Sequence, residues 1–236
     1  MSGELRMLGL AHGLLLGLLL ASPLIGPDML PWAVQALFLL GGFQLRLADR
    51  RWDLRGGPIA WISHIRMAPR RLLPWAAAAV VALIAGRIDL AQAIVGATLL
   101  CELLVYPISA HLIARLARPM VAGLILLLIG VQGATGSPML GYVVAFLTGL
   151  STCLFWLRGP DGDGPTMIWA LGATTAAIVA PIVAPITLPC AFAVGTVSAT
   201  LALAHLSVLR RRPVPWRSDL RQTVRRGLWL APARPF

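Results

Sequence analysis

Residues 167–209 form an unbroken run of 43 residues without Asp, Glu, Lys or Arg. As a single helix this run would measure about 65 Å at 1.5 Å per residue, which is twice the ~30 Å thickness of a bilayer core. It is therefore predicted to form two membrane spans rather than one. The turn between them is expected within the proline-rich stretch 181–189, because proline removes helical hydrogen-bond donors.

The composition of the whole chain supports a membrane protein. Of its 236 residues, 58% are hydrophobic and 12% are charged, whereas soluble domains carry about a quarter charged residues. This balance excludes a disordered chain, a small secreted scaffold held by disulfides and a water-soluble enzyme. The three cysteines lie inside apolar segments without a CxxC pair, so neither a disulfide nor a metal site is expected.

The fold class predicted from these patterns is an all-α, polytopic transmembrane bundle of about eight spans. Turn residues and charges divide the apolar segments from one another. Six spans are predicted before the uncharged run, and the run itself supplies the last two. The first six cover residues 7–25, 29–47, 72–86, 90–114, 119–136 and 138–157.

The arginines predict the orientation of the bundle. All 20 basic residues are Arg, which is typical of a GC-rich bacterial genome, so we expect a bacterial cytoplasmic membrane. If both chain ends are cytoplasmic, 19 of the 20 arginines lie on the cytoplasmic side and only Arg87 lies outside. The positive-inside rule predicts such a division, and a wrong number of spans would destroy it. The prediction is therefore an N-in, C-in topology.

A possible internal repeat divides the chain into parts. The tripeptide Ala-His-Leu occurs at 110–112 and 204–206, and each copy is followed five residues later by Arg-Pro. Two parallel four-helix halves would explain this, as they do in several transport folds. Chance matches between apolar sequences are the alternative. The predicted first half covers residues 1–118 and includes an Arg-rich loop at 46–71. The second half covers 119–209, and a basic amphipathic tail follows at 210–236.

Glu102 is an ionisable acid near the middle of the predicted span 90–114. A charged acid there costs about 2.5–3.5 kcal/mol on insertion scales, so such residues usually face a polar interior. Helical spacing places three polar residues on the same side of the helix as Glu102. These are Thr98, Tyr106 and Ser109, and the corresponding positions of the second half are Thr196 and Thr200.

Two interpretations of this polar stripe are open. In the first, Glu102 binds a proton or cation, or anchors a substrate, and the six residues line a transport path. In the second, Glu102 makes a structural hydrogen bond between helices, worth around 1 kcal/mol. The histidines have no metal-binding spacing, and His64 is assigned to the cytoplasmic segment 46–71.

Clusters of arginine at the predicted cytoplasmic face are expected to contact anionic lipid headgroups. The tail 215–229 has the pattern of an amphipathic helix that lies in the membrane interface. Residues 58–67 are expected to form a second interfacial helix. Binding of a phosphorylated or lipid-linked substrate is the alternative role. The candidate arginines are Arg50, Arg51, Arg70, Arg71, Arg221, Arg225 and Arg226.

The function predicted from the sequence is transport of a small solute, ion or lipid through a polar path between helices. A membrane-embedded enzyme acting on a lipid-linked phosphorylated substrate, and a non-catalytic subunit of a membrane complex, are the alternatives. No catalytic motif, metal cluster or cofactor motif occurs, so no catalytic residue or cofactor is assigned. Expected partners are membrane lipids and either further copies of the chain or the subunits of a membrane complex, but no nucleic acid.

Overall fold

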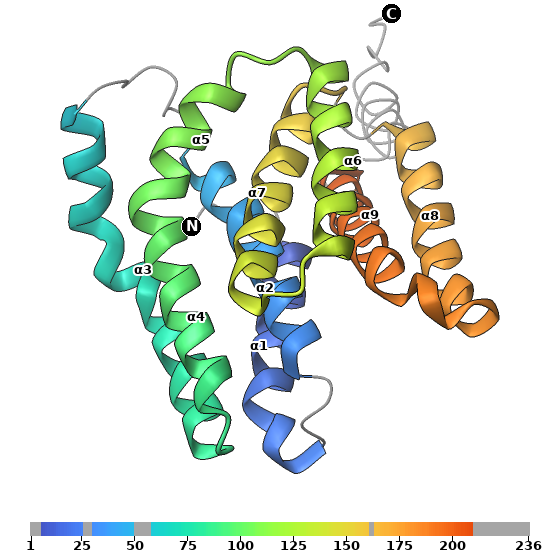
Figure 1. The fold of residues 1–236 in the computed structure, drawn as a ribbon. Helices are drawn as coiled ribbons and strands as arrows, with labels where there is room; N and C mark the ends of the chain where they lie inside the picture. The colour runs from blue at the N-terminus through green and yellow to red at the C-terminus, as the bar shows by residue number, and fades with distance from the viewer. Residues whose placement is uncertain (1–5, 26–29, 50–57, 161–162, 210–236) are drawn as a thin grey trace, which may run out of the picture.

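The computed structural model describes residues 6–25, 30–49, 58–160 and 163–209. Within these ranges all regular structure is helical, which confirms the predicted all-α class (Figure 1). Four of the described helices are long and apolar enough to cross a membrane: Ile88–Ile113, Pro138–Leu157, Gly164–Val183 and Pro185–Val208. The larger number of eight spans stays a prediction, as does the internal repeat.

The helices follow one another as a series of hairpins. A continuous rod built from α4, a π-helical turn η4 and α5 is called the α4–α5 rod below. The first half of the chain contains α1 (Arg6–Ile25), α2 (Leu30–Ala48), α3 (Pro58–Ile84), α4 (Ile88–Leu100), η4 (Cys101–Val105) and α5 (Tyr106–Ile113). The second half contains α6 (Arg118–Ala134), α7 (Pro138–Leu157), α8 (Gly164–Val183), the 3₁₀ turn η5 (Pro185–Thr187) and α9 (Leu188–Leu209).

The uncharged run 167–209 does form two helices, and the turn lies in the predicted stretch 181–189. Pro181 lies in the last turn of α8, and the chain then turns through η5 before α9 begins. The two helices pack along each other, and the Thr174 hydroxyl lies 2.9 Å from the Ser198 hydroxyl across their interface. Proline and the short 3₁₀ turn thus end one helix and start the next.

One boundary predicted from the sequence is wrong. The span expected at 72–86 is the second half of a longer helix, α3, which begins at Pro58 and runs through the prolines at 69 and 74. Residues 58–67 are therefore not a separate interfacial helix. Arg46, assigned to the cytoplasmic loop 46–71, lies in the last turn of α2 instead. Part of the predicted Arg-rich loop consequently belongs to the bundle.

The centre of the bundle is the crossing of α2 and α7, with α3 and the α4–α5 rod on one side and α8 and α9 on the other (Figure 1). Two glycines make this crossing close. A Cβ atom added to Gly149 would fall inside contact distance of the Leu39 carbonyl oxygen, and one added to Gly42 would meet the Phe146 carbonyl oxygen. Small residues allow this approach of two helix backbones, as they commonly do in membrane bundles.

The outer helix α8 buries little of its surface. It packs chiefly on α9, and Trp169, Ile182 and Val183 are among its strongly exposed apolar side chains. Water would make such a surface unfavourable, whereas lipid tails would not. The exposed apolar surface of α8 is therefore compatible with a membrane protein.

Candidate functional site

The α4–α5 rod places the predicted polar stripe in the interior. Four residues of the stripe are buried: Thr98, Glu102, Tyr106 and Ser109. Glu102 is only 5% exposed. Ser109 donates its hydroxyl hydrogen to the carbonyl oxygens of its own helix, whereas the Thr98 hydroxyl has no hydrogen-bond partner in the described part of the chain. The structure thus brings these four residues to one buried side of a single helix, and their function stays a prediction.

Glu102 lies in the π-helical turn η4, and Pro107 explains why the α-helix is interrupted there. The Tyr106 amide donates to the Cys101 carbonyl oxygen, five residues back, instead of four. The next residue, Pro107, has no amide hydrogen, and its ring would clash with the carbonyl group four residues before it. Widening the helix by one residue relieves this clash, and such π turns occur frequently at functional sites.

Two carbonyl groups of the α4–α5 rod lie one turn before Pro107, which has no amide hydrogen. An amide at position 107 would serve Leu103 in an α turn or Glu102 in a π turn. Side chains of α3 replace it. The Trp61 indole Nε1–H donates to the Leu103 carbonyl oxygen at 3.0 Å, and the His64 Nε2 lies 2.9 Å from the Glu102 carbonyl oxygen. One missing amide leaves one of these carbonyls without a main-chain donor, and both are contacted from a neighbouring helix.

His64 also contacts the Glu102 carboxylate. Its Nε2 lies 3.3 Å from Oε2 of Glu102. Because a carbonyl oxygen only accepts hydrogen bonds, the 2.9 Å contact requires the hydrogen to be on Nε2. The same N–H therefore faces both the backbone and the side chain of Glu102. This arrangement orients the imidazole and keeps the carboxylate next to a group that can carry a proton.

Tyr106 joins this pair to the end of α2. Its ring stacks on the His64 ring with centroids 4.9 Å apart. Its hydroxyl group lies 3.4 Å from Oδ2 of Asp49, to which it donates, and next to the Arg46 guanidinium. The five residues Arg46, Asp49, His64, Glu102 and Tyr106 are called the Glu102 cluster below. They come from three elements, α2 with the residue that follows it, α3 and the α4–α5 rod.

The Glu102 cluster contains two basic side chains and two carboxylates. Arg46 is 1% exposed, and its guanidinium also donates to the Asp49 carbonyl oxygen at 3.3 Å. A buried guanidinium needs negative partners, and the cluster offers two carboxylates. The two basic side chains and the two carboxylates of the cluster can therefore compensate one another in this largely buried region.

The structure separates the second group of predicted path residues from Glu102. Thr196 and Thr200 lie on α9, and their hydroxyls donate to carbonyl oxygens of the same helix, at 3.0 Å and 2.6 Å. The α4–α5 rod and α9 lie on different sides of the central pair α2 and α7 (Figure 1). The two stripes expected to line one path are thus not brought together in this structure.

The arginines expected at lipid headgroups fall mostly outside what the structure describes. Arg50 and Arg51 lie outside the described residues, as do the tail arginines 221, 225 and 226. Arg70 and Arg71 belong to α3, but their side chains are not described. Contact with lipid phosphate stays a prediction for all of them.

Sequence reasoning missed His64, Arg46 and Asp49 because it placed them in a cytoplasmic loop. The apolar period at Ile62 and Ile65 was a usable signal for a helix, but it was assigned to the wrong surroundings. Both isoleucines are exposed, whereas His64 faces the interior. In lipid the apolar side of a helix faces outward and the polar side faces the bundle, which is the reverse of the rule for a soluble protein.

The comparisons with known proteins leave the function to be argued from this geometry. No protein-family model, no curated protein and no solved structure matches the chain. The strongest functional feature in the described residues is therefore the Glu102 cluster itself.

Proposed function

We propose that this chain is a bacterial inner-membrane protein with eight spans that moves a small solute across the membrane together with a proton. The four helices that are long and apolar enough to cross a membrane support the membrane location. Shorter apolar segments in α1, α3 and α6 support additional spans. The arginine distribution of the sequence supports cytoplasmic ends for the chain.

The contact between His64 and Glu102 carries the proposal of proton coupling. Ionisable side chains inside membrane spans are costly and mark ion or proton pathways more often than other residues do. Here an acid and an imidazole lie 3.3 Å apart within an apolar bundle. Tyr106 connects them to Asp49, which is partly exposed at the end of α2. The contacts of the His64–Glu102 pair thus extend through Tyr106 to a partly exposed acid.

The crossing of α2 and α7 supports a repeated architecture, which is common among transporters. In the two-half scheme these helices occupy equivalent places. Their contact is reciprocal, because Gly42 approaches the Phe146 carbonyl while Gly149 approaches the Leu39 carbonyl. The hairpins of α3 with α4 and of α8 with α9 also occupy equivalent places on either side of the crossing. Two halves related in this way can rock about their central contact.

The test is solute-dependent proton flux in proteoliposomes that contain a trapped pH-sensitive dye. Separate additions of small amides, polyols, amino acids and short carboxylic acids are compared under an imposed pH gradient. We expect at least one class to produce proton movement with the wild-type protein. Glu102→Gln is expected to abolish this movement, because the amide cannot exchange a proton.

Asp89→Asn is the matched control. Asp89 is an exposed acid in the first turn of α4, on the same rod as Glu102 but outside the Glu102 cluster. The control variant is expected to transport like the wild type. Absence of proton movement with every solute class, or an unchanged flux in Glu102→Gln, would overturn the proposal and leave a structural membrane subunit as the better explanation.

A further inference from the structure

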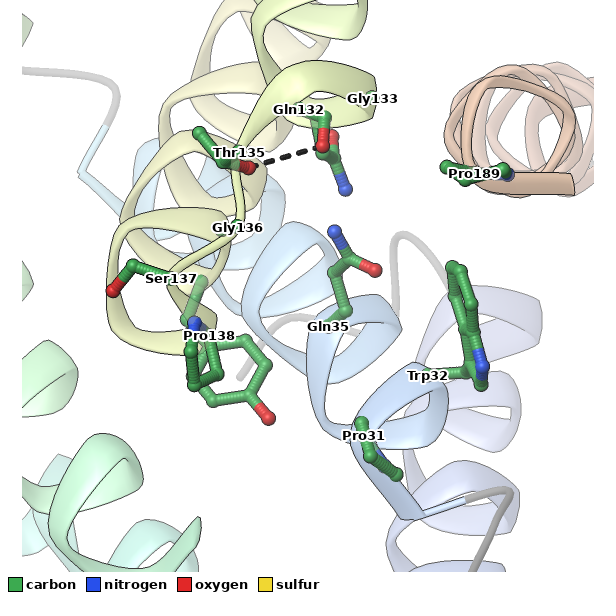
Figure 2. Close-up of a pocket in the computed structure, with 12 residues that line it drawn as sticks. Pro31, Trp32, Gln35, Gln132, Gly133, Thr135, Gly136, Ser137, Pro138 and Pro189 are labelled. Carbon is green, nitrogen blue, oxygen red and sulfur yellow. Dashed lines mark hydrogen bonds between the residues drawn. The ribbon is translucent and has the colours of Figure 1, made fainter. Parts of the chain in front are cut away.

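A cavity of about 250 Å³ lies where α2, α7 and α9 begin and α6 ends (Figure 2). Its lining contains Trp32 and Gln35 from α2, Gln132 from α6, Tyr142 from α7 and Pro189 from α9. No lining residue is charged, and none belongs to the Glu102 cluster. This cavity is therefore a separate feature from the proton-coupling site.

Two residues that line the cavity have buried polar atoms without a hydrogen-bond partner in the part of the chain that the structure describes. Both the Nε2 and the Oε1 atoms of Gln132 lack a hydrogen-bond partner in the described residues, although Gln132 is only 5% exposed. The Tyr142 hydroxyl also lacks one, and Tyr142 is 3% exposed. Buried polar groups in folded proteins are almost always hydrogen-bonded. Unpaired atoms of this kind therefore indicate that a ligand bound in the cavity supplies their hydrogen bonds. The main-chain carbonyl of Gln132 does have a donor, the Thr135 hydroxyl at 3.0 Å.

The carboxamides of Gln35 and Gln132 extend toward each other across the cavity (Figure 2). A carboxamide offers one acceptor oxygen and two donor hydrogens. A ligand that presents a donor and an acceptor side by side would pair with Gln132, as one amide pairs with another. The indole of Trp32, another lining residue, packs against the Phe192 ring of α9 with centroids 4.9 Å apart.

We propose that this cavity binds a small uncharged solute that carries a carboxamide. Charge is disfavoured because the lining offers no counter-ion, and burying an unpaired ion is very unfavourable. Size follows from the volume, since about 250 Å³ equals roughly eight water molecules and is smaller than the usual drug-sized pocket. The inference names the solute class of the proposed transporter and in that respect rests on the proposed function.

The test is saturation-transfer NMR with acetamide as the probe and detergent-solubilised protein. We expect saturable transfer to the acetamide methyl group in the wild type. Gln132→Met keeps the size of the side chain but removes its polar atoms, and it is expected to weaken acetamide binding about tenfold or more. Tyr142→Phe is expected to weaken binding as well. The thermal stability of Gln132→Met is expected to be equal to or above that of the wild type, because the amide has no partner to lose.

Gln44→Met is the matched control variant and acetate is the matched control probe. Gln44 lies on α2 outside the cavity, where its amide donates to the Leu8 carbonyl oxygen at 3.3 Å. Acetamide binding is expected to be unchanged in this variant. Acetate has nearly the same shape as acetamide but is charged, so it is expected not to bind. Failure of acetamide to bind the wild type, equal binding by Gln132→Met or a preference for acetate would each overturn the proposal.

Binding in detergent does not require transport, which separates this proposal from the previous one. If acetamide binding depends on Gln132 while Glu102→Gln leaves proton flux unchanged, the cavity assignment stands and proton coupling fails. If Glu102→Gln abolishes solute-dependent flux while acetamide does not bind, proton coupling stands and the cavity assignment fails.

Discussion

The Nε2 atom of His64 lies 2.9 Å from the backbone carbonyl oxygen of Glu102 and 3.3 Å from its carboxylate. One imidazole N–H thus faces two acceptors of the same residue. Pro107, which has no amide hydrogen, follows in the same helix, and the neighbouring Leu103 carbonyl accepts a hydrogen bond from Trp61. A helix-breaking residue and a buried ionisable pair are therefore parts of one structural arrangement.

Trp61→Phe and Pro107→Ala are expected to be coupled in stability. In the wild type, Trp61→Phe removes the donor to the Leu103 carbonyl and should lower the free energy of unfolding by about 0.5–1.5 kcal/mol. In a Pro107→Ala background the new amide hydrogen of residue 107 can donate to the Leu103 carbonyl. The decrease in the free energy of unfolding caused by Trp61→Phe should then be near zero. Denaturant unfolding of the four proteins in detergent, followed by circular dichroism, measures the coupling. Additivity of the two changes to within about 0.3–0.5 kcal/mol would contradict this account of the π turn.

His64→Ala is expected to destabilise the protein by about 1–3 kcal/mol, because it leaves two acceptors of Glu102 without their donor in the interior. His111→Ala is the control. His111 lies on the same rod but is exposed, and its Nε2 lies 3.1 Å from the Arg115 guanidinium, so its loss should change stability by less than about 0.5 kcal/mol. Thermal unfolding in one detergent compares the two variants. Equal effects would show that the His64 contact is unimportant for the fold.

Gly149→Ala is expected to disrupt the crossing of α2 and α7. The added methyl group would overlap the Leu39 backbone, which cannot move away as a flexible side chain would, so we expect a loss of about 2–3 kcal/mol or failure to fold. Gly130→Ala on α6 has open space around the new Cβ atom and should be neutral or stabilising by up to about 1 kcal/mol. Size-exclusion profiles after heating report both outcomes. A Gly149→Ala protein as stable as the wild type would rule out this close crossing.

Cysteine labelling in intact cells tests the N-in, C-in topology. In a chain whose three cysteines have been replaced by alanine, Ser137→Cys and Asp163→Cys place single thiols just before α7 and just before α8. A membrane-impermeant maleimide should label position 137 from outside and position 163 only after the cells are opened, because α7 separates them. The reverse pattern would invert the orientation, and labelling of both from outside would show that α7 does not cross.

The helical class, the turn in 181–189 and the interior side of the α4–α5 rod could be predicted because each depends on local pattern. Hydropathy over a span and the helical repeat around Glu102 are properties of contiguous residues. The length of α3 could not be predicted in this way. Its first half carries arginines and prolines, and these indicate a loop unless the contacts of Trp61 and His64 with the α4–α5 rod are known.

The amino-acid sequence by itself determined that this chain folds as helices, where most of them turn and that an acid lies within an apolar helix. Tertiary structure alone decided what that acid contacts. His64, Tyr106, Asp49 and Arg46 come from three elements distant in sequence, and only packing brings their polar atoms within hydrogen-bonding distance. Packing likewise left the Gln132 amide buried without a partner among the described residues. The physical reason is that lipid selects apolar residues span by span, whereas the pairing of buried polar groups depends on which helices lie side by side.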